Sequence, residues 1–222
     1  NDGSGPVKTR AGQILMAIGR RPDVSRLLGK DISLDMKDGK IAVDSDFETS
    51  EPGVYAIGDV AARTQLAHVA AAQGTYVVEK IAGRPHSIKL EVVPNGMFVS
   101  LPIVPNCIYT DPEIATVGIT EEIAKKYGLK VRCGHFSMRD NGKSIITGEE
   151  HGFIRLLFEA YSNTIVGAQM MCPRATDMIG EIATAIANGL TAQEMSFAMR
   201  AQPTYNEGIG AAIEDAMRQN PV

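Results

Sequence analysis

Two short apolar runs in the first quarter of the chain each end at a glycine. Residues 54–57 (Val-Tyr-Ala-Ile) precede Gly58, and residues 13–18 (Gln-Ile-Leu-Met-Ala-Ile) precede Gly19. Runs of this length are typical of buried strands in a parallel sheet. Because glycine permits a sharp turn, Asp59 is expected just past the carboxyl end of a strand, where open α/β sheets bind their ligands.

Helical spacing replaces these runs further along. Apolar residues over 66–81 recur at helical intervals, and glycine and proline follow them, which predicts a helix. A short helix is expected near 25–28, and a small strand over 40–43 after the hairpin-forming turn at 38–39. Residues 91–105 are rich in proline and glycine, so we interpret them as a linker with a domain boundary near residue 97.

The second half reads as strands followed by helices, the order of an α+β domain. Strands are expected at 107–110, 114–119, 131–136, 152–159 and 164–171, and helices at 120–127, 175–188, from 191 and at 207–217. The strands at 152–159 and 164–171 are predicted to form an antiparallel hairpin. Thr120 is the predicted N-cap of its helix, the Thr191–Glu194 spacing predicts a capping box, and Asn206 is the predicted N-cap of the last helix.

Composition excludes several classes of protein. The 222 residues carry a net charge of −4 and no run of Lys or Arg, which argues against a nucleic-acid partner. No apolar stretch reaches the ~20 residues of a membrane span. Cys107, Cys133 and Cys172 are too far apart for a redox or zinc pair, and no metal site is expected. Scattered thiols indicate a reduced, cytoplasmic protein, and the first residue, Asn1, suggests a chain that starts partway through a larger one.

Four stretches carry a resemblance to a known family: residues 14–22, 49–59, 65–74 and 202–207, in that order. Together they resemble the pyridine nucleotide–disulfide oxidoreductases, and within them most closely the dihydrolipoamide dehydrogenases. The resemblance spans essentially the whole chain but only the carboxyl-terminal half of such an enzyme. It implies an α/β segment, comprising the end of an NAD domain at 1–22 and the second part of an FAD domain at 23–96. An α+β dimerisation domain with an antiparallel sheet follows at 97–222.

The same resemblance implies cofactors and the residues that contact them. FAD and NAD are the family's cofactors, and Gly19 corresponds to a glycine that lies against NAD. Asp59 corresponds to the carboxylate that contacts the flavin, and the segment that follows it lies under the isoalloxazine ring: Gln65, Leu66, Ala67 and His68. Backbone N–H groups at the start of a helix suit a reduced flavin, which carries negative charge.

The family's catalytic pattern near the carboxyl end is His-Pro-Thr-x-x-Glu, in which the His is the general base and the Glu orients it across a dimer interface. Here Glu207 matches, but Gln202 stands at the position of the His. An amide takes up no proton near neutral pH, whereas an imidazole titrates there. No G-x-G-x-x-G loop opens a helix in this chain and no cysteine pair has C-x-x-x-x-C spacing.

Two interpretations therefore stay open. The chain is the carboxyl-terminal portion of a flavoenzyme that passes electrons from a dithiol through a disulfide and FAD to NAD, or of a related disulfide or mercuric reductase. Alternatively, it is a catalytically silent dimerisation or assembly module. The resemblance implies a homodimer, and a lipoyl protein or a 2-oxo acid dehydrogenase complex as partner. Without the phosphate-binding loop, the chain alone is expected to bind neither FAD nor NAD tightly.

Overall fold

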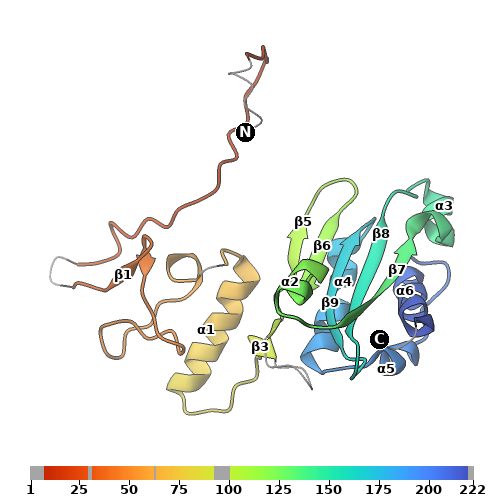
Figure 1. Ribbon diagram of the computed structural model, residues 1–222. Helices are drawn as coiled ribbons and strands as arrows, with labels where there is room; N and C mark the ends of the chain where they lie inside the picture. The colour runs from red at the N-terminus through yellow and green to blue at the C-terminus, as the bar shows by residue number, and fades with distance from the viewer. Residues whose placement is uncertain (1–7, 30–31, 63, 93–100, 220–222) are drawn as a thin grey trace. The chain divides into compact units, whose positions relative to one another are not determined.

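The computed structural model describes residues 8–29, 32–62, 64–92 and 101–219 (Figure 1). The chain divides into two compact units, residues 1–77 and residues 78–222. The first unit is built mostly from turns and one helix, and the second from a sheet covered by helices. Each unit has its own buried apolar cluster.

A small hairpin lies at the centre of the first unit. Strands β1 (Met36–Lys37) and β2 (Lys40–Ile41) pair antiparallel, with Met36 opposite Ile41. The two turn residues, Asp38 and Gly39, both have positive φ, of 53° and 77°, as the tightest hairpin turns require. The predicted hairpin is confirmed, although β2 is shorter than expected, and the buried side chain of Ile41 joins the cluster of this unit.

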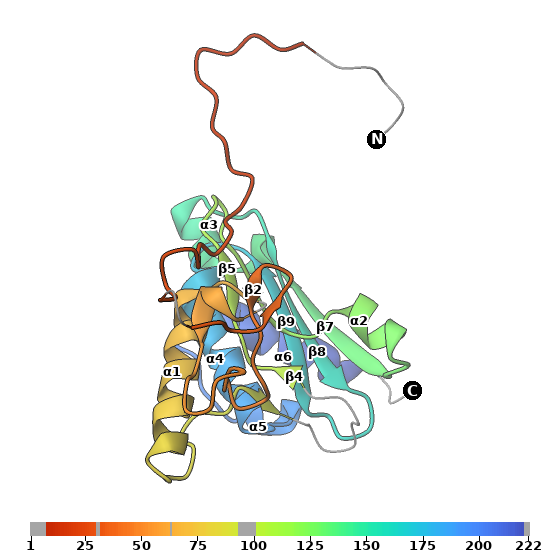
Figure 2. The same ribbon diagram turned by 90° about the vertical axis from the view of Figure 1, so that its left-hand side faces the viewer.

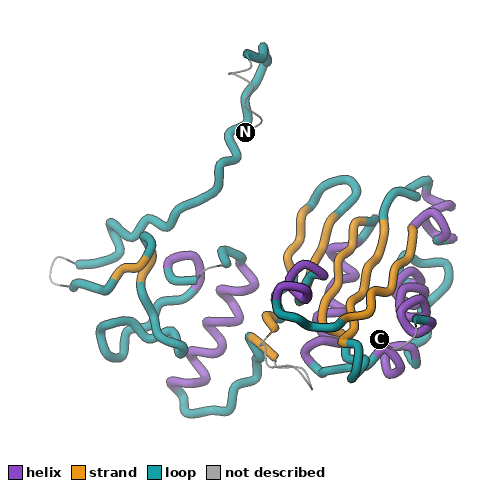
Figure 3. Tube along the Cα trace, in the orientation of Figure 1, coloured by secondary structure: helices purple, strands orange, loops and turns teal. Residues whose placement is uncertain are grey.

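Two strands expected in the first unit are not formed. Residues 54–57 contribute a single bridge between Tyr55 and Glu48, and residues 13–18 run as an exposed loop in which Leu15 is 90% exposed (Figure 3). A strand exists only when a neighbour pairs with its N–H and C=O groups. In the described part of the chain, residues 13–18 have no such neighbour, and residues 54–57 pair only with the short segment 47–49, which gives an isolated bridge in place of a ladder. The predicted helix at 25–28 is likewise wrong, since these residues form a turn.

The predicted long helix is confirmed as α1 (Ala67–Ile81), with Val69, Gln73 and Val77 buried along one face. The short 3₁₀ turn η1 (Gly58–Val60) packs directly against it. The N–H of Gly58 donates to the Gln73 side-chain carbonyl at 2.8 Å, and a Cβ added at Gly58 would lie 2.9 Å from that of Ala70. A side chain at position 58 would therefore separate the turn from the helix.

The second unit is organised on a five-stranded antiparallel sheet (Figures 1 and 2). Its strands are β5 (Asn106–Ile108), β6 (Ile114–Gly118), β7 (Val131–Ser137), β8 (Phe153–Glu159) and β9 (Ile165–Met171), in the order β5-β6-β9-β8-β7. The predicted hairpin is β8–β9, with Phe153 opposite Met171. The expected α/β segment followed by an antiparallel α+β domain is confirmed.

Helices cover both faces of this sheet. The larger cluster lies beneath α4 (Ala175–Ala187), α5 (Ala192–Ser196) and α6 (Glu207–Arg218), while α2 (Glu121–Lys126) covers the smaller cluster on the opposite face. β7 and α6 approach so closely that a Cβ at Gly134 would lie 1.9 Å from the carbonyl oxygen of Ala212. Helix α6, which begins at Glu207, therefore packs directly on the sheet.

Helix caps follow the sequence in two cases and depart from it in a third. The Thr120 hydroxyl accepts the N–H of Ile123 at 3.2 Å, and Thr191 and Glu194 form the expected capping box. Asn206 does not cap α6 with its side chain, because its backbone is already helical and its amide is engaged elsewhere.

Four further elements depart from the sequence expectation. The linker region contains a two-residue ladder, β3 (Glu91–Val92) with β4 (Leu101–Pro102). The turn η2 (Met138–Asp140) and the helix α3 (Gly142–Thr147) were not expected. The predicted boundary near residue 97 lies outside the described residues.

Candidate functional site

The segment that carries Gln202 is a tight turn immediately before α6. Its peptide bond between Gln202 and Pro203 is cis. One carboxylate oxygen of Glu207 accepts the N–H of Thr204 at 2.8 Å, and the Thr204 hydroxyl donates to the carbonyl of Ala201 at 2.6 Å. Glu207 is the first residue of α6, and its side chain accepts from the backbone of a residue that lies two positions before the N-cap, Asn206. The resemblance implies that Glu207 orients a base, which stays a prediction; in the structure its carboxylate also fixes the backbone of the turn.

A buried asparagine that the sequence reading missed holds this turn from the side. Asn141 is 2% exposed; its amide nitrogen donates to the carbonyl of Thr204 at 3.0 Å, and its oxygen accepts the N–H of Ser144 at 2.9 Å. The same side chain therefore caps α3 and anchors the turn. The signal in the sequence was an Asn before a glycine, which is a common N-cap position, but α3 was not predicted.

A third contact comes from α4. The two carboxylate oxygens of Glu181 accept from Arg200 Nη2 at 2.5 Å and from the amide of Asn206 at 2.8 Å. The Arg200 side chain is only 9% exposed and its Nη1 also donates to the carbonyl of Ala198. Arg200 and Asn206 flank the turn on its two sides, so one carboxylate engages both of its ends.

Gln202 and Glu207 line the same cavity of about 450 Å³. Polar and charged side chains form much of its wall: Asp140, Asn141, Arg200, Gln202, Glu207 and Glu214. No histidine lines it in the described part of the chain. The resemblance implies that Glu207 orients the side chain at position 202; both residues line this cavity, and their catalytic roles stay predictions.

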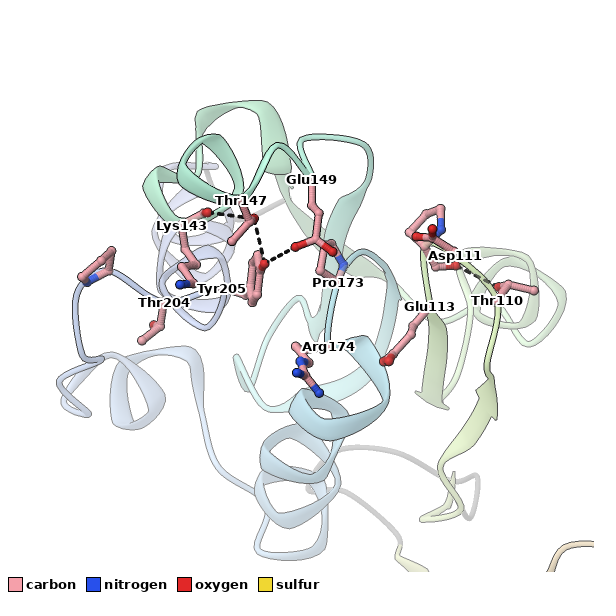
Figure 4. A pocket seen from close by; sticks show the side chains of 12 residues that line it. Thr110, Asp111, Glu113, Lys143, Thr147, Glu149, Pro173, Arg174, Thr204 and Tyr205 are labelled. Atoms are coloured by element: carbon pink, nitrogen blue, oxygen red, sulfur yellow. Dashed lines mark hydrogen bonds between the residues drawn. The ribbon is translucent and has the colours of Figure 1, made fainter.

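A second cavity, of about 680 Å³, lies beside the same turn and is lined by Thr204 and Tyr205 (Figure 4). The Tyr205 hydroxyl hydrogen-bonds to Glu149 at 2.5 Å and to Thr147 at 2.9 Å. The hydrogen bond from Tyr205, together with that from Thr147, lowers the pKa of the Glu149 carboxyl. Burial, and then the bond to Glu149, raises the pKa of Tyr205. Tyr205 therefore remains a neutral hydrogen-bond donor that ties the turn to the end of α3.

In the first unit, the structure brings Asp59 and the start of α1 into one neighbourhood. Asp59 lies in η1, half-buried, and no described residue donates a hydrogen bond to its carboxylate. Gln65 and Leu66 are half-buried just before the helix, while Ala67 and His68 are exposed in its first turn.

Gly19 is not joined to this group. It lies in the exposed loop with φ of +94°, and a Cβ added there would meet no described atom within 4 Å. Its expected contact with NAD stays a prediction.

The three thiols form no disulfide with one another, and none of them has a lowered pKa. All are free. Burial raises the pKa of Cys107 and Cys133, and raises that of Cys172 to about 12. Since the thiolate is the nucleophile, each is held in its less reactive form.

Metal clusters and membrane-spanning helices are both missing from the described part of the chain. No group of three or more metal-ligating side chains gathers among these residues. No described helix combines the length and the apolar character needed to cross a membrane.

Comparison with known proteins decides the family. Residues 104–213 match the dimerisation domain of the pyridine nucleotide-disulphide oxidoreductases, and residues 2–74 match the pyridine nucleotide-disulphide oxidoreductase domain. The chain belongs to the pyridine nucleotide-disulphide oxidoreductase family. The first matched segment ends before the proline- and glycine-rich region at 91–105 and the second begins near the end of that region, and the exact domain bounds stay a prediction.

Relatives in this family include dihydrolipoyl dehydrogenases. That of Geobacillus stearothermophilus is 34% identical over 218 residues, covering 97% of this chain and 44% of the relative. One from Bacillus subtilis is 35% identical over 203 residues, covering 91% of this chain and 40% of the relative. The chain thus spans less than half the length of the curated relatives it matches.

Two solved structures share the fold of this chain. LpdA from Mycobacterium tuberculosis superposes with a TM-score of 0.79 at 27% identity, covering 92% of this chain and 42% of that one. The HOCl-induced flavoprotein disulfide reductase RclA from Escherichia coli gives a TM-score of 0.75 at 18% identity, covering 90% and 43%. The second likeness concerns the fold alone.

Proposed function

We propose that this chain is the carboxyl-terminal portion of a flavin-dependent, dihydrolipoamide dehydrogenase-like oxidoreductase that passes electrons between a dithiol and NAD. Family membership along both units is the observation that carries the proposal. The chain's own contribution is one side of a flavin site in the first unit and a substrate-side turn in the second.

The first unit fits one edge of a flavin. Asp59 offers a carboxylate with no donor from the described residues, and it lies beside a helix start whose first N–H groups lack intrahelical partners. Gly58 keeps these two elements in contact. When bound, FAD would supply the electron transfer. Asp59 and residues 65–68 would hold and orient it, and Gly19 would lie against NAD.

The second unit presents the Gln202 turn to the substrate. Gln202 can donate and accept hydrogen bonds but takes up no proton near neutral pH, so the turn orients a reacting thiol without removing its proton. A glutamine at this position supports slow dithiol oxidation, or a related disulfide or mercuric reductase reaction that depends less on a general base. The matched dimerisation domain supports a homodimer, and a lipoyl protein is the proposed electron donor.

The second candidate function is a catalytically silent dimerisation or assembly module. The observation that favours it is the glutamine at the position of the family's base. Both candidates predict a dimer, so oligomeric state does not separate them.

The flavin spectrum of the purified complete gene product separates the candidates. A yellow protein whose absorbance is bleached by NADH supports the oxidoreductase, and a colourless protein that NADH leaves unchanged supports the module. As a control, the chain of residues 1–222 alone should not take up FAD. Stoichiometric binding to it with a Kd below about a micromolar, roughly −8 kcal/mol, would contradict the view that the site is shared with other residues.

A further inference from the structure

The turn that carries Gln202 is held at both ends by one side chain. Glu181 lies in α4, a helix of 13 residues that packs on the main core through Met178, Ile179 and Ile182. Its Oε1 accepts from Arg200 at 2.5 Å and its Oε2 from Asn206 at 2.8 Å. Because Arg200 precedes and Asn206 follows residues 201–205, the carboxylate closes the turn against a rigid helix.

Burial makes the arginine side of this contact hard to replace. The Arg200 side chain is 9% exposed, and its Nε is buried with no hydrogen-bond partner in the described part of the chain. A buried guanidinium that lost its carboxylate would be an uncompensated charge, which is strongly unfavourable. The position of the Arg200 side chain therefore depends on the Glu181 carboxylate.

Arg200 also lies along α6, where a small residue leaves room for it. A Cβ built at Gly210 would stand 3.5 Å from Arg200 Nη1 and 3.6 Å from its Cδ, in ordinary contact. Gly210 follows Glu207 by three residues and faces the same cavity. The guanidinium thus joins α4 to the face of α6 that lines the candidate site.

Gln202 itself makes no hydrogen bond with any described residue, and its side chain is exposed to the cavity it lines. Its position is set by the backbone on either side of it. That backbone is held by Asn141 at the N-cap of α3, by Glu207 at the start of α6, and by the two contacts to Glu181.

We propose that Glu181 is a positioning residue for the substrate-side turn, acting through Arg200 and Asn206 to fix where Gln202 and Glu207 present their polar groups. The proposal rests on the proposed function for its effect on turnover. Its effect on the turn itself does not depend on that function.

The test variant is Glu181→Gln, which keeps the shape of the side chain. A glutamine offers one acceptor oxygen in place of two, and its NH₂ faces a donor from Arg200 or Asn206. The matched control is Glu121→Gln, since Glu121 is also a helical carboxylate paired with an arginine of another element, Arg155 at 3.2 Å, but lies away from the turn. Asn206→Ala serves as a second, milder variant that leaves the ion pair intact.

Hydrogen–deuterium exchange on the complete gene product gives the first readout. The backbone amides of residues 201, 202 and 204–206 in Glu181→Gln should exchange at least tenfold faster while those of β8 and β9 stay protected, and Glu121→Gln should match the parent protein. Asn206→Ala should show the same change to a smaller degree. Unchanged exchange in the turn for both test variants would overturn the proposal, and so would loss of protection throughout the sheet in both.

Kinetics give the second readout and separate this proposal from the proposed function. For the flavin-loaded protein, kcat with a dithiol should fall about tenfold in Glu181→Gln, with the rate of flavin reduction by NADH unchanged. A faster-exchanging turn with undiminished kcat would refute the positioning role. A parent protein that binds no flavin refutes the proposed function instead, and leaves the exchange result to judge the turn.

Discussion

Replacing Gly134 by alanine should strongly destabilise the second unit. The added Cβ would stand 1.9 Å from the carbonyl oxygen of Ala212, 2.9 Å from its carbonyl carbon and 2.9 Å from the Cβ of Ala216. Ordinary contact begins at 3.4 Å, so β7 and α6 must separate by about 1.5 Å. The atoms met are mainly backbone, which cannot turn aside as a flexible side chain could.

The expected loss of stability follows from the side chains that α6 buries where it packs on β7. Ile209, Ala212, Ile213 and Ala216 are each at most 1% exposed. A gap of 0.5–1 Å already forfeits about a quarter to a half of a van der Waals contact, and overpacked cores typically lose about 1–3 kcal/mol. Because backbone must move here, we expect a loss near the top of that range, about 3 kcal/mol.

Urea unfolding followed by far-UV circular dichroism measures this loss. Gly180→Ala in α4 is the matched control, since no atom lies within 4 Å of its added Cβ, and alanine in a helix interior gains about 0.5–1 kcal/mol over glycine. The two variants should therefore shift the midpoint in opposite directions. A Gly134→Ala protein within about 0.5 kcal/mol of the parent would refute the claim that β7 and α6 are in backbone contact.

Three further predictions each rest on a single side chain. In the complete flavoprotein, Gln202→His should raise the rate of dihydrolipoamide oxidation by about 10²–10⁴-fold and add an ionisation near pH 6–8, because Glu207 keeps one carboxylate oxygen free of described donors to hold an imidazole. Steady-state rates measured against pH check this. A variant with no gain in rate would mean that the site has diverged beyond one residue. Thr120→Ala should cost about 1 kcal/mol by removing the cap of α2, measured by the same urea titration with Thr75→Ala, a mid-helix threonine of α1, as the comparison. Burial raises the pKa of Cys172 from 9.0 to about 12, so between those pH values the unfolded chain loses a thiol proton that the folded chain keeps; stability should fall by about 1.4 kcal/mol per pH unit there, and Cys172→Ala should abolish that component of the slope.

The sequence predicted the second unit far better than the first. Strand and helix bounds of the sheet domain came within a few residues, because its alternating and helical patterns are satisfied by partners within the chain. In the first unit, residues 13–18 and 54–57 have strand-like sequences, but the first run has no paired neighbour among the described residues and the second forms only an isolated bridge. The hydrophobic periodicity of a segment shows which element it is able to form, but a strand forms only where a neighbouring segment pairs with it.

The candidate site was half visible in the sequence. Gln202 and Glu207 stood out because they interrupt or match a family pattern at fixed spacing. Asn141 and Glu181 are separated from the turn by 63 and 25 residues in their hydrogen bonds, so no local spacing points to them. Such contacts exist only once β8, β9 and α4 have brought distant segments together.

The strand order of the sheet also indicates which strand pairs form early and which form late during folding. β8 and β9 are joined by a short turn and can pair as soon as both are made, whereas β6 pairs with β9 across about fifty residues. Closing so long a loop is entropically costly and pairings of this kind slow folding. During synthesis β6 emerges well before its partner, and its neighbour β5 gives it only a three-residue ladder meanwhile. We expect the β8–β9 hairpin to nucleate the unit, with β6 added late, so that a stalled ribosome complex ending before residue 165 would expose β6 to proteases and chaperones.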